Sequence, residues 1–365
     1  MAIINSSSAY LLLPPTPRFL ELSISPSSTP PKPEPLPSAG QPTSDMERPR
    51  FVIEAAEAQQ IAKRSGLTLR QLLPTLVESA QSLARPPISK YHVGAVGLGS
   101  SGRIFIGVNL EFPGLPLHHT VHAEQFLVTN LSINAEPRLQ YFAVSAAPCG
   151  HCRQFLQEIR GAPNINILIT SSQYENDNAK PQGDTGIKEE FEFNPLSYYL
   201  PERFGPDDLL GKDVPLLLEA HDNALSFSEF SNGEITGDDL KYAALDAANM
   251  SHAPYSGCPS GVALVDVEGK VYKGSYTESA AYNPSLGPVQ AALVAYVANS
   301  DGGGYERIVD AVLVEKADAM VKQEHTARLL LQCISPKCEL KVQISAVMST
   351  LGLELSPKTA GALIL

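Results

Sequence analysis

Four residues of this chain have the types and spacing of a metal centre with an open coordination position. His122 and Glu124 stand two residues apart, and Cys149 and Cys152 form a Cys-x-x-Cys pair directly after Pro148. At the start of a helix, both sulfurs of such a pair fall on one side of the first turn, where unpaired N–H groups favour thiolates. A structural zinc ion usually has four protein ligands, whereas three ligands leave one position for water. The sequence therefore predicts a catalytic zinc site with His122, Cys149 and Cys152 as ligands and Glu124 outside the ligand set.

The same pattern, His-x-Glu followed by Pro-Cys-x-x-Cys, resembles the signature of zinc deaminases that act on cytosine or adenine. Zinc lowers the pKa of a bound water from 15.7 to about 7, which makes hydroxide available at neutral pH. Glu124 is then expected to take the proton of that water, protonate ring nitrogen N3 and carry a proton to the departing amine. The alternatives are a structural zinc knuckle, which would have no use for Glu124, a chance pair of cysteines, and a fourth ligand from His118, His119 or His151. His151 is expected to point away from the side that the two cysteines share.

Two apolar runs upstream predict a β-hairpin around a glycine-containing turn. Residues 91–97 and 103–111 flank the turn at 100–102. Asn109 and Glu111 are two residues apart on the expected second strand, so both side chains should leave one face of the sheet. An amide and a carboxylate that project together can hold a sugar hydroxyl, and the carboxylate would repel a phosphate. The alternative is that both residues only cap the end of the strand.

Three segments make the chain similar to cytidine deaminases of the two-domain, homodimeric type. They are residues 107–112, 120–125 and 147–154, and the similarity extends from about Met46 to about Val347. The resemblance implies a homodimer that deaminates cytidine and deoxycytidine to uridine and deoxyuridine in pyrimidine salvage. It also implies that His122, Cys149 and Cys152 bind zinc and that Glu124 transfers protons. Asn109 and Glu111 would then donate or accept hydrogen bonds with the ribose 3′-hydroxyl. Tyr91 would pack on the pyrimidine, and Ala123 would make a further substrate contact. Family members often carry Phe at the position of Tyr91, so its hydroxyl has no assigned role.

The chain also repeats itself, and the second copy lacks the chemistry. A shift of 167 residues places six residues of the first copy on matching residues of the second, namely Pro87, Ser89, Gly94, Gly102, Gly107 and Glu111 on Pro254, Ser256, Gly261, Gly269, Gly274 and Glu278. After a two-residue slip, Gly287 and Val289 stand where His122 and Glu124 stand in the first copy. The second copy is therefore expected to be a scaffold, which leaves one zinc per chain. In the resembling dimers such a copy lends residues to the partner's site, and Ala281 and Tyr282 are the candidates.

Composition limits the compartment and the partners. The chain has 365 residues, 43% hydrophobic content and a net charge of −12, and this acidic balance disfavours a nucleic-acid partner. No apolar stretch approaches the ~20 residues of a membrane span. Five cysteines, two of them assigned to the metal, leave no even disulfide framework, which favours a reducing compartment. We therefore expect a cytoplasmic enzyme with a small-molecule nucleoside substrate; organelle targeting through the N-terminal extension is the alternative.

The chain divides into five predicted segments and has an α/β fold class. The segments are a Ser/Pro-rich extension expected to be disordered (1–45), a catalytic zinc deaminase domain (46–172), a linker and strap (173–237), a degenerate deaminase-like domain (238–347) and a tail (348–365). In the first domain, helical patterns such as 72–83 alternate with strand patterns such as 139–146. This alternation predicts a mixed sheet covered on both faces, hence tandem α/β/α three-layer domains.

Two other functions stay open on the sequence alone. A deoxycytidylate deaminase or a polynucleotide cytosine deaminase uses the same zinc chemistry but needs room and positive charge for phosphate, which Glu111 and the net charge oppose. A non-catalytic binding module stabilised by zinc would leave Glu124 without a role. The residues favour deamination of a free nucleoside.

Overall fold

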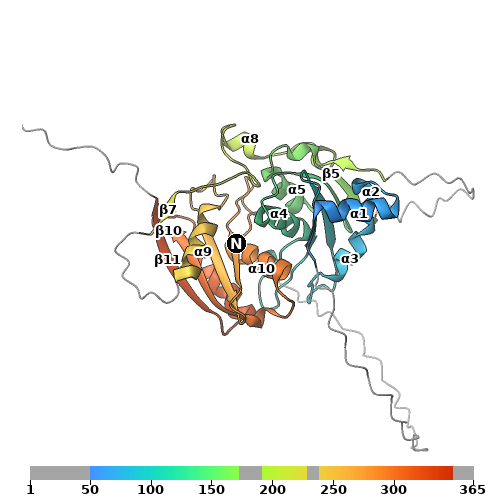
Figure 1. The fold of residues 1–365 in the computed structure, drawn as a ribbon. Helices are drawn as coiled ribbons and strands as arrows, with labels where there is room; N and C mark the ends of the chain where they lie inside the picture. The colour runs from blue at the N-terminus through green and yellow to red at the C-terminus, as the bar shows by residue number, and fades with distance from the viewer. Residues whose placement is uncertain (1–49, 172–190, 228–237, 348–365) are drawn as a thin grey trace, which may run out of the picture. The chain divides into compact units, whose positions relative to one another are not determined.

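The computed structural model describes residues 50–171, 191–227 and 238–347 (Figure 1). These residues belong to one compact unit. The expected extension 1–45, the tail 348–365 and parts of the linker lie outside the described residues, and the five segment boundaries stay predictions.

The first copy is built on a mixed sheet of six strands. Their order is β1-β3-β2-β4-β5-β6, in which β4 and β5 run parallel and the other neighbours antiparallel. The strands are β1 Val52–Ile53, β2 Gly94–Gly99, β3 Ile104–Val108, β4 Leu139–Val144, β5 Asn166–Ile169 and β6 Asn194–Pro195. The α-helices are α1 Ala55–Ser65, α2 Leu69–Thr75, α3 Val77–Ser82, α4 Ala123–Ile133, α5 Gly150–Phe155, α7 Leu196–Tyr199 and α8 Pro206–Leu209.

The second copy repeats this sheet with five strands. Their order is β7-β11-β10-β8-β9, with β10 and β11 parallel. Taken from the other edge, β9-β8-β10-β11-β7 reproduces β3-β2-β4-β5-β6 in order and in the direction of every pair. The strands are β7 Leu225–Ser226, β8 Ser260–Asp266, β9 Val271–Ser275, β10 Ile308–Lys316 and β11 Glu339–Val347, and the helices are α9 Asp238–Asn249, α10 Pro288–Asn299 and α11 Glu324–Ile334. The expected tandem α/β fold is confirmed.

Two strand glycines show why each copy has three layers. A Cβ on Gly94 would collide with the backbone of α3, and a Cβ on Gly107 would collide with the backbone of α4. Gly107 pairs with Ala95, the neighbour of Gly94, so the two glycines face opposite sides of the sheet. Helices therefore cover both faces, and the strands approach them closely because these positions carry no side chain.

The second copy has the same close contacts between strand and helix, but the sequence offset between α4 and α10 differs from that between β3 and β9. Gly107 lies against Ala123 and Leu127, whereas Gly274 lies against Pro288 and Ala292. The strand position shifts by 167 residues and the helix positions by 165, which is the two-residue slip expected from the sequence. Position 287 of the second copy is thus the structural counterpart of His122, and position 289 that of Glu124.

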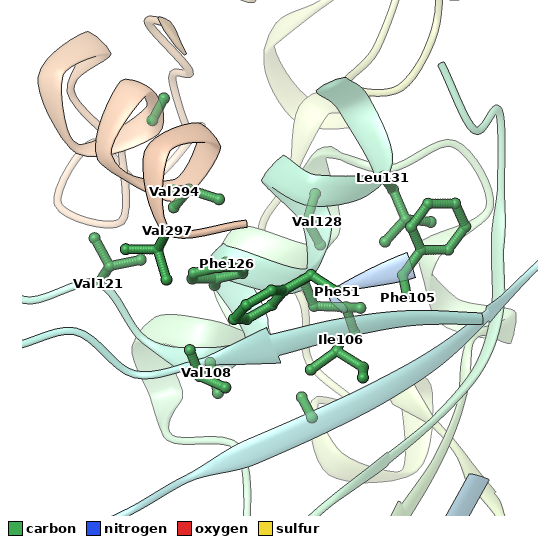
Figure 2. Close-up of a cluster of buried hydrophobic side chains, with 14 of the residues drawn as sticks. Phe51, Phe105, Ile106, Val108, Val121, Phe126, Val128, Leu131, Val294 and Val297 are labelled. Atoms are coloured by element: carbon green, nitrogen blue, oxygen red, sulfur yellow. The ribbon is translucent and has the colours of Figure 1, made fainter. Parts of the chain in front are cut away.

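Helices α4 and α10 pack against each other, so that one hydrophobic core includes residues of both copies. Figure 2 shows Val294 and Val297 of α10 beside Val121 and Phe126 of the first copy. Phe126 also stacks on Phe51 with ring centroids 5.2 Å apart. Because α4 carries residues of the predicted site at its first turn, this packing fixes the site against the second copy.

Three local expectations are wrong. The helix expected at 72–83 is divided at Leu76 into α2 and α3, and Pro74 lies in α2 just before the break. The hairpin strands cover 94–99 and 104–108 rather than 91–97 and 103–111. Asn109 and Glu111 therefore follow β3 instead of lying in it, because the chain beyond Val108 makes only isolated bridges.

Candidate active site and metal centre

The three predicted ligands converge where two helices begin. His122 is the N-cap residue of α4 and Cys149 is the N-cap residue of α5. Nδ1 of His122 lies 3.5 Å from Sγ of Cys149 and 3.3 Å from Sγ of Cys152, and the two sulfurs are 3.7 Å apart. A tetrahedral ion with Zn–S bonds of about 2.3 Å and Zn–N bonds of about 2.0 Å holds such atoms about 3.5 to 3.8 Å apart. The donor set and its spacing therefore fit zinc.

No other group of three or more His, Cys, Asp or Glu side chains in the described part of the chain is placed to hold a metal ion. The thiol of Cys149 is prepared to act as a ligand, because thiolates are the form that binds zinc. Hydrogen bonding with the side chains of Cys152 and His122 lowers the pKa of Cys149 to about 3. The described residues thus provide one zinc site per chain.

Glu124 lies in the first turn of α4 and is only 4% exposed. Its Oε2 accepts a hydrogen bond of 3.2 Å from Sγ of Cys152. Burial raises the pKa of Glu124 above its ordinary value, so the carboxylate is a better proton acceptor than one in water. Ala123, between His122 and Glu124, is buried as well, and a substrate contact by Ala123 stays a prediction.

Gln125 is a part of the site that the sequence reasoning missed. Its Oε1 accepts a hydrogen bond of 3.2 Å from the backbone N–H of His122, and its Nε2 donates to the carbonyl of Pro284 at 3.0 Å. The first contact caps α4 and fixes the turn that carries His122. A Gln three residues after an N-cap position is the sequence signal that would have found it. The second contact attaches this turn to the second copy.

Asn109 holds the chain segment just before β2. Its Nδ2 donates to the carbonyl of Tyr91 at 2.9 Å, and its Oδ1 accepts from the N–H of Val93 at 2.9 Å. Tyr91 itself is 61% exposed. The ribose contact of Asn109 and the pyrimidine contact of Tyr91 stay predictions.

Glu111 is bound to the same segment. Its Oε2 accepts from the N–H groups of Ile88 and Ser89 at 2.9 Å each, and its Oε1 accepts from Oγ of Ser89 at 2.5 Å. Burial alone would raise the pKa of Glu111, but the hydrogen bonds from Ser89 and Ile88 outweigh it and lower the pKa. The carboxylate therefore stays ionised, and its ribose contact stays a prediction.

The second copy repeats the contacts of Glu111 at Glu278. The Glu278 carboxylate accepts from the N–H groups of Tyr255 and Ser256 at 2.8 and 3.0 Å, and from Oγ of Ser256. Lys90 and Gly257, at matching positions, both have a positive φ, of 59° and 63°. Among the described residues of the second copy, no group of side chains is placed to hold a metal ion, so holding this loop is a structural task of the fold. Any ribose contact of Glu111 comes in addition.

Two further predicted residues lie outside the metal group. His151 stacks on the ring of His122 with centroids 5.1 Å apart. Tyr282 is 68% exposed and has a φ of 62°, in a loop that the Pro284 carbonyl attaches to Gln125 of the same chain. The reach of Tyr282 into a partner's site stays a prediction.

The chain has two α/β/α copies, and one of them has a His-Cys-Cys centre with a buried glutamate beside it. These features are typical of the class of zinc-dependent nucleobase deaminases. Residues 68–168 and 196–328 each match the family described as cytidine and deoxycytidylate deaminase zinc-binding region. The chain belongs to this family.

Named relatives agree with the family match. Cytidine deaminase 1 of Arabidopsis thaliana is 65% identical over 301 residues, which cover 81% of this chain and 98% of that protein. A protein named probable inactive cytidine deaminase 4, from the same plant, is 42% identical over 80% of this chain and 94% of its own length. Among solved structures, a cytidine deaminase from Mycobacterium tuberculosis is 27% identical, with a TM-score of 0.28 over 37% of this chain and 95% of that chain. Because one relative is named as inactive, the activity of this chain has to be argued from its site residues.

Proposed function

We propose that this chain is a zinc-dependent cytidine deaminase that converts cytidine and deoxycytidine to uridine and deoxyuridine. The observation that carries the proposal is the His-Cys-Cys group with the carboxylate of Glu124 buried beside it. The family match and the relatives named cytidine deaminase support it.

The residues of the site divide the chemistry between them. His122, Cys149 and Cys152 would hold the zinc ion, which when bound makes hydroxide available near neutral pH. Glu124 takes up one proton of the attacking water and delivers it to N3 of the cytosine ring as the oxygen bonds to C4. It then carries the remaining hydroxyl proton to the amine, which leaves C4 as ammonia. Its burial excludes bulk water, so the proton moves between Glu124 and the substrate rather than to solvent.

The charge near the expected sugar position favours a nucleoside over a nucleotide. Glu111 stays ionised, and a carboxylate repels a 5′- or 3′-phosphate group. We assign Asn109 and Glu111 to the ribose hydroxyl and Tyr91 to the face of the pyrimidine. A deoxycytidylate or polynucleotide deaminase would need positive charge at this place.

Oligomeric state, pathway and compartment belong to the proposal as well. We propose a homodimer that acts in pyrimidine salvage in the cytoplasm; targeting through residues 1–45 is the alternative for the compartment. Within the described residues, no helix has the length and apolar character that a membrane crossing requires.

The test is a side-by-side assay of zinc-replete protein on four substrates and a single strand of DNA. We expect turnover of cytidine and deoxycytidine, and much slower turnover of their monophosphates and of cytosine in the strand. Faster turnover of a monophosphate would contradict the role of Glu111, and zinc binding without any turnover would leave only a zinc-stabilised binding module.

A further inference from the structure

The second copy has an open strand edge that borders a groove of about 320 Å³. β9 lies at the edge of its sheet, and among the described strands only β8 pairs with it. Residues 270–275, which include all of β9, line the groove together with residues of α10 and α4. In the first copy, β3 corresponds to β9, and β1 covers its outer edge. The described part of the second copy therefore has no counterpart of β1.

β1 is held in the first copy by a backbone hydrogen bond and by ring stacking. The carbonyl of Phe51, directly before β1, accepts from the N–H of Ile106 in β3 at 2.9 Å. The ring of Phe51 stacks on Phe126 of α4. Because α4 and α10 are offset by 165 residues, Ala291 stands at the position of Phe126, and Ala291 lines the groove. A methyl group in place of a phenyl ring contributes to the open volume.

The opposite wall of the groove corresponds as well. Val294 and Val297 of α10 lie beside Phe126 in the first copy (Figure 2). The same offset of 165 residues leads back to Thr129 and Ser132 of α4, and both line the groove. Each copy thus uses a helix of the other copy as a wall. The groove is therefore the place in the second copy that β1 takes in the first.

The edge of β9 offers backbone groups and no uncompensated charge. The pairing of β8 with β9 repeats that of β2 with β3 residue for residue, so the N–H of Lys273 faces the open edge as that of Ile106 faces β1. Nζ of Lys273 donates to the carboxylate of Asp246. Nζ of Lys270, the other charged group of the described lining, donates to the carbonyl of Asn299. An open edge beside an apolar groove pairs most readily with another extended segment.

We propose that the tail of this chain adds a strand to β9 through residues 362–365, Ala-Leu-Ile-Leu. This run has no charge and no proline, and its Leu and Ile side chains suit a groove lined by Val128, Ile133 and Phe155. The register of the sheet places the end of β11, where the tail begins, at the same end as Ser275. A segment that enters there and runs antiparallel to β9 has the direction that β1 has along β3.

The length of the tail decides which of its residues can occupy the groove. β10 and β8 separate β11 from β9, so a strand added to β9 lies four strand spacings from β11, or about 19 Å. Leu351 follows the end of β11 by four residues and extends at most ~14 Å from it. Leu363 follows the same end by sixteen residues and can extend ~50 Å. The run at 362–365 therefore reaches the groove, whereas Leu351 does not.

Hydrogen exchange of the zinc-replete full chain, read from peptides that cover β9, tests the proposal. We expect the outward N–H groups of β9 to exchange slowly in the unsubstituted protein, because the added strand binds them. Leu363→Asp places a charge in an apolar groove and should speed their exchange at least tenfold. Leu351→Asp is the matched control, because it makes the same change in the same tail at a position that does not reach the groove. Exchange of β3, which β1 covers, should stay unchanged in both variants.

Other states of the groove give other results, and each of them overturns the proposal. Fast exchange of the outward N–H groups in the unsubstituted protein would show that the groove is open. Slow exchange that persists in Leu363→Asp but is lost from a chain without residues 1–45 would assign the groove to the N-terminal extension. Protection that rises with protein concentration would assign it to a strand from a second copy of the chain. None of these measurements uses deamination, so the outcome is independent of the proposed function.

Discussion

At the scale of single residues, each site residue of the first copy can be compared with its counterpart in the second copy. Glu111 and Glu278 make the same hydrogen bonds to matching serines, yet only Glu111 lies in a copy that has metal ligands. His122 and Glu124, in contrast, have no counterpart with the same chemistry, because Gly287 and Val289 replace them. Paired substitutions therefore separate what the fold requires from what the reaction requires.

We expect Glu111→Gln to raise the KM for cytidine about tenfold, because a charge-assisted hydrogen bond to a hydroxyl is roughly twice as strong as a neutral one. Glu278→Gln is the matched control and should lower the melting temperature without changing KM. Steady-state kinetics and thermal unfolding of both variants measure the two effects. Equal KM values in the two variants would show that Glu111 is only a structural residue.

Glu124→Gln should keep one zinc per chain and reduce kcat by at least ~10² to 10⁴, the range for loss of one general acid–base group. The three ligands are unchanged, and only the proton carrier is removed. Metal analysis together with a cytidine assay checks both parts, with Glu57→Gln on α1 as the control. Turnover near the wild-type rate in the zinc-replete variant contradicts the mechanism.

At the scale of elements, the site depends on how closely helices approach the sheets. The N-termini of α4 and α5 bring three ligands together, and Gly107 lets α4 lie directly on β3. The corresponding Gly274 lets α10 lie on β9 in the same way. The two glycines have one structural task, but only Gly107 supports a helix with a metal ligand at its start.

Gly107→Ala should therefore destabilise the protein by about 1–3 kcal/mol, the usual range for overpacking, and weaken zinc binding. The added Cβ collides with the backbone at Ala123 and Leu127, which has to move away from β3. Gly274→Ala should cost similar stability and leave zinc affinity unchanged. Chemical denaturation and competition with a zinc chelator measure the two quantities; equal zinc affinities would show that α4 accommodates the methyl group without moving His122.

His221, in the segment before β7, gives stability a dependence on pH. Two causes lower the pKa of His221 to about 4: burial, which is the larger, and the ring of His252, whose centroid lies 5.2 Å away. The unfolded chain then binds a proton below its ordinary pKa of about 6.5, whereas the folded chain does so only near pH 4. This contribution to stability is thus complete above pH 6.5 and lost as the pH falls towards 4.

Replacing His221 by Gln should therefore make the melting temperature fall less between pH 6.5 and pH 4 than in the wild type. His325→Gln, at an exposed position of α11, is the control and should follow the wild-type curve. Thermal unfolding over this pH range checks the prediction. A wild-type slope in His221→Gln would assign the acid sensitivity to other groups.

At the scale of the whole molecule, the two copies are joined by buried polar contacts as well as by the shared core. The carboxylate of Glu158, which is fully buried, accepts hydrogen bonds from Nε2 of His252, Oη of Tyr255 and N–H of Ala280. Gln125 reaches Pro284 a few residues further along the second copy. The loop from Ala280 to Pro284, which carries Tyr282, is therefore fixed at both ends by the catalytic copy of its own chain.

We predict one zinc per chain and a homodimer with two zinc ions as the active species. A copy that keeps its fold without its chemistry is most simply explained by a surface that still packs against catalytic domains, and two-fold pairing is the commonest closed arrangement. Metal analysis and analytical sedimentation measure the two numbers. Two zinc ions per chain, or full activity in a stable monomer, would contradict the scaffold role of the second copy.

The sequence by itself determined the repeat and which side chains are candidates for metal binding and proton transfer, because these depend on residue type and on short spacings. A His-x-Glu and a Cys-x-x-Cys at helix starts need only the first turn of each helix to place their atoms, and paired glycines reveal a duplicated strand without any structure. Only the tertiary structure decided that Asn109 and Glu111 lie beyond the strand, where they bind the segment before β2. It also decided that Glu158 and Gln125 join the two copies. The contacts of Glu158 and Gln125 with the second copy link residues 94 to 159 positions apart. No local periodicity shows which distant carbonyl or amide a buried side chain meets.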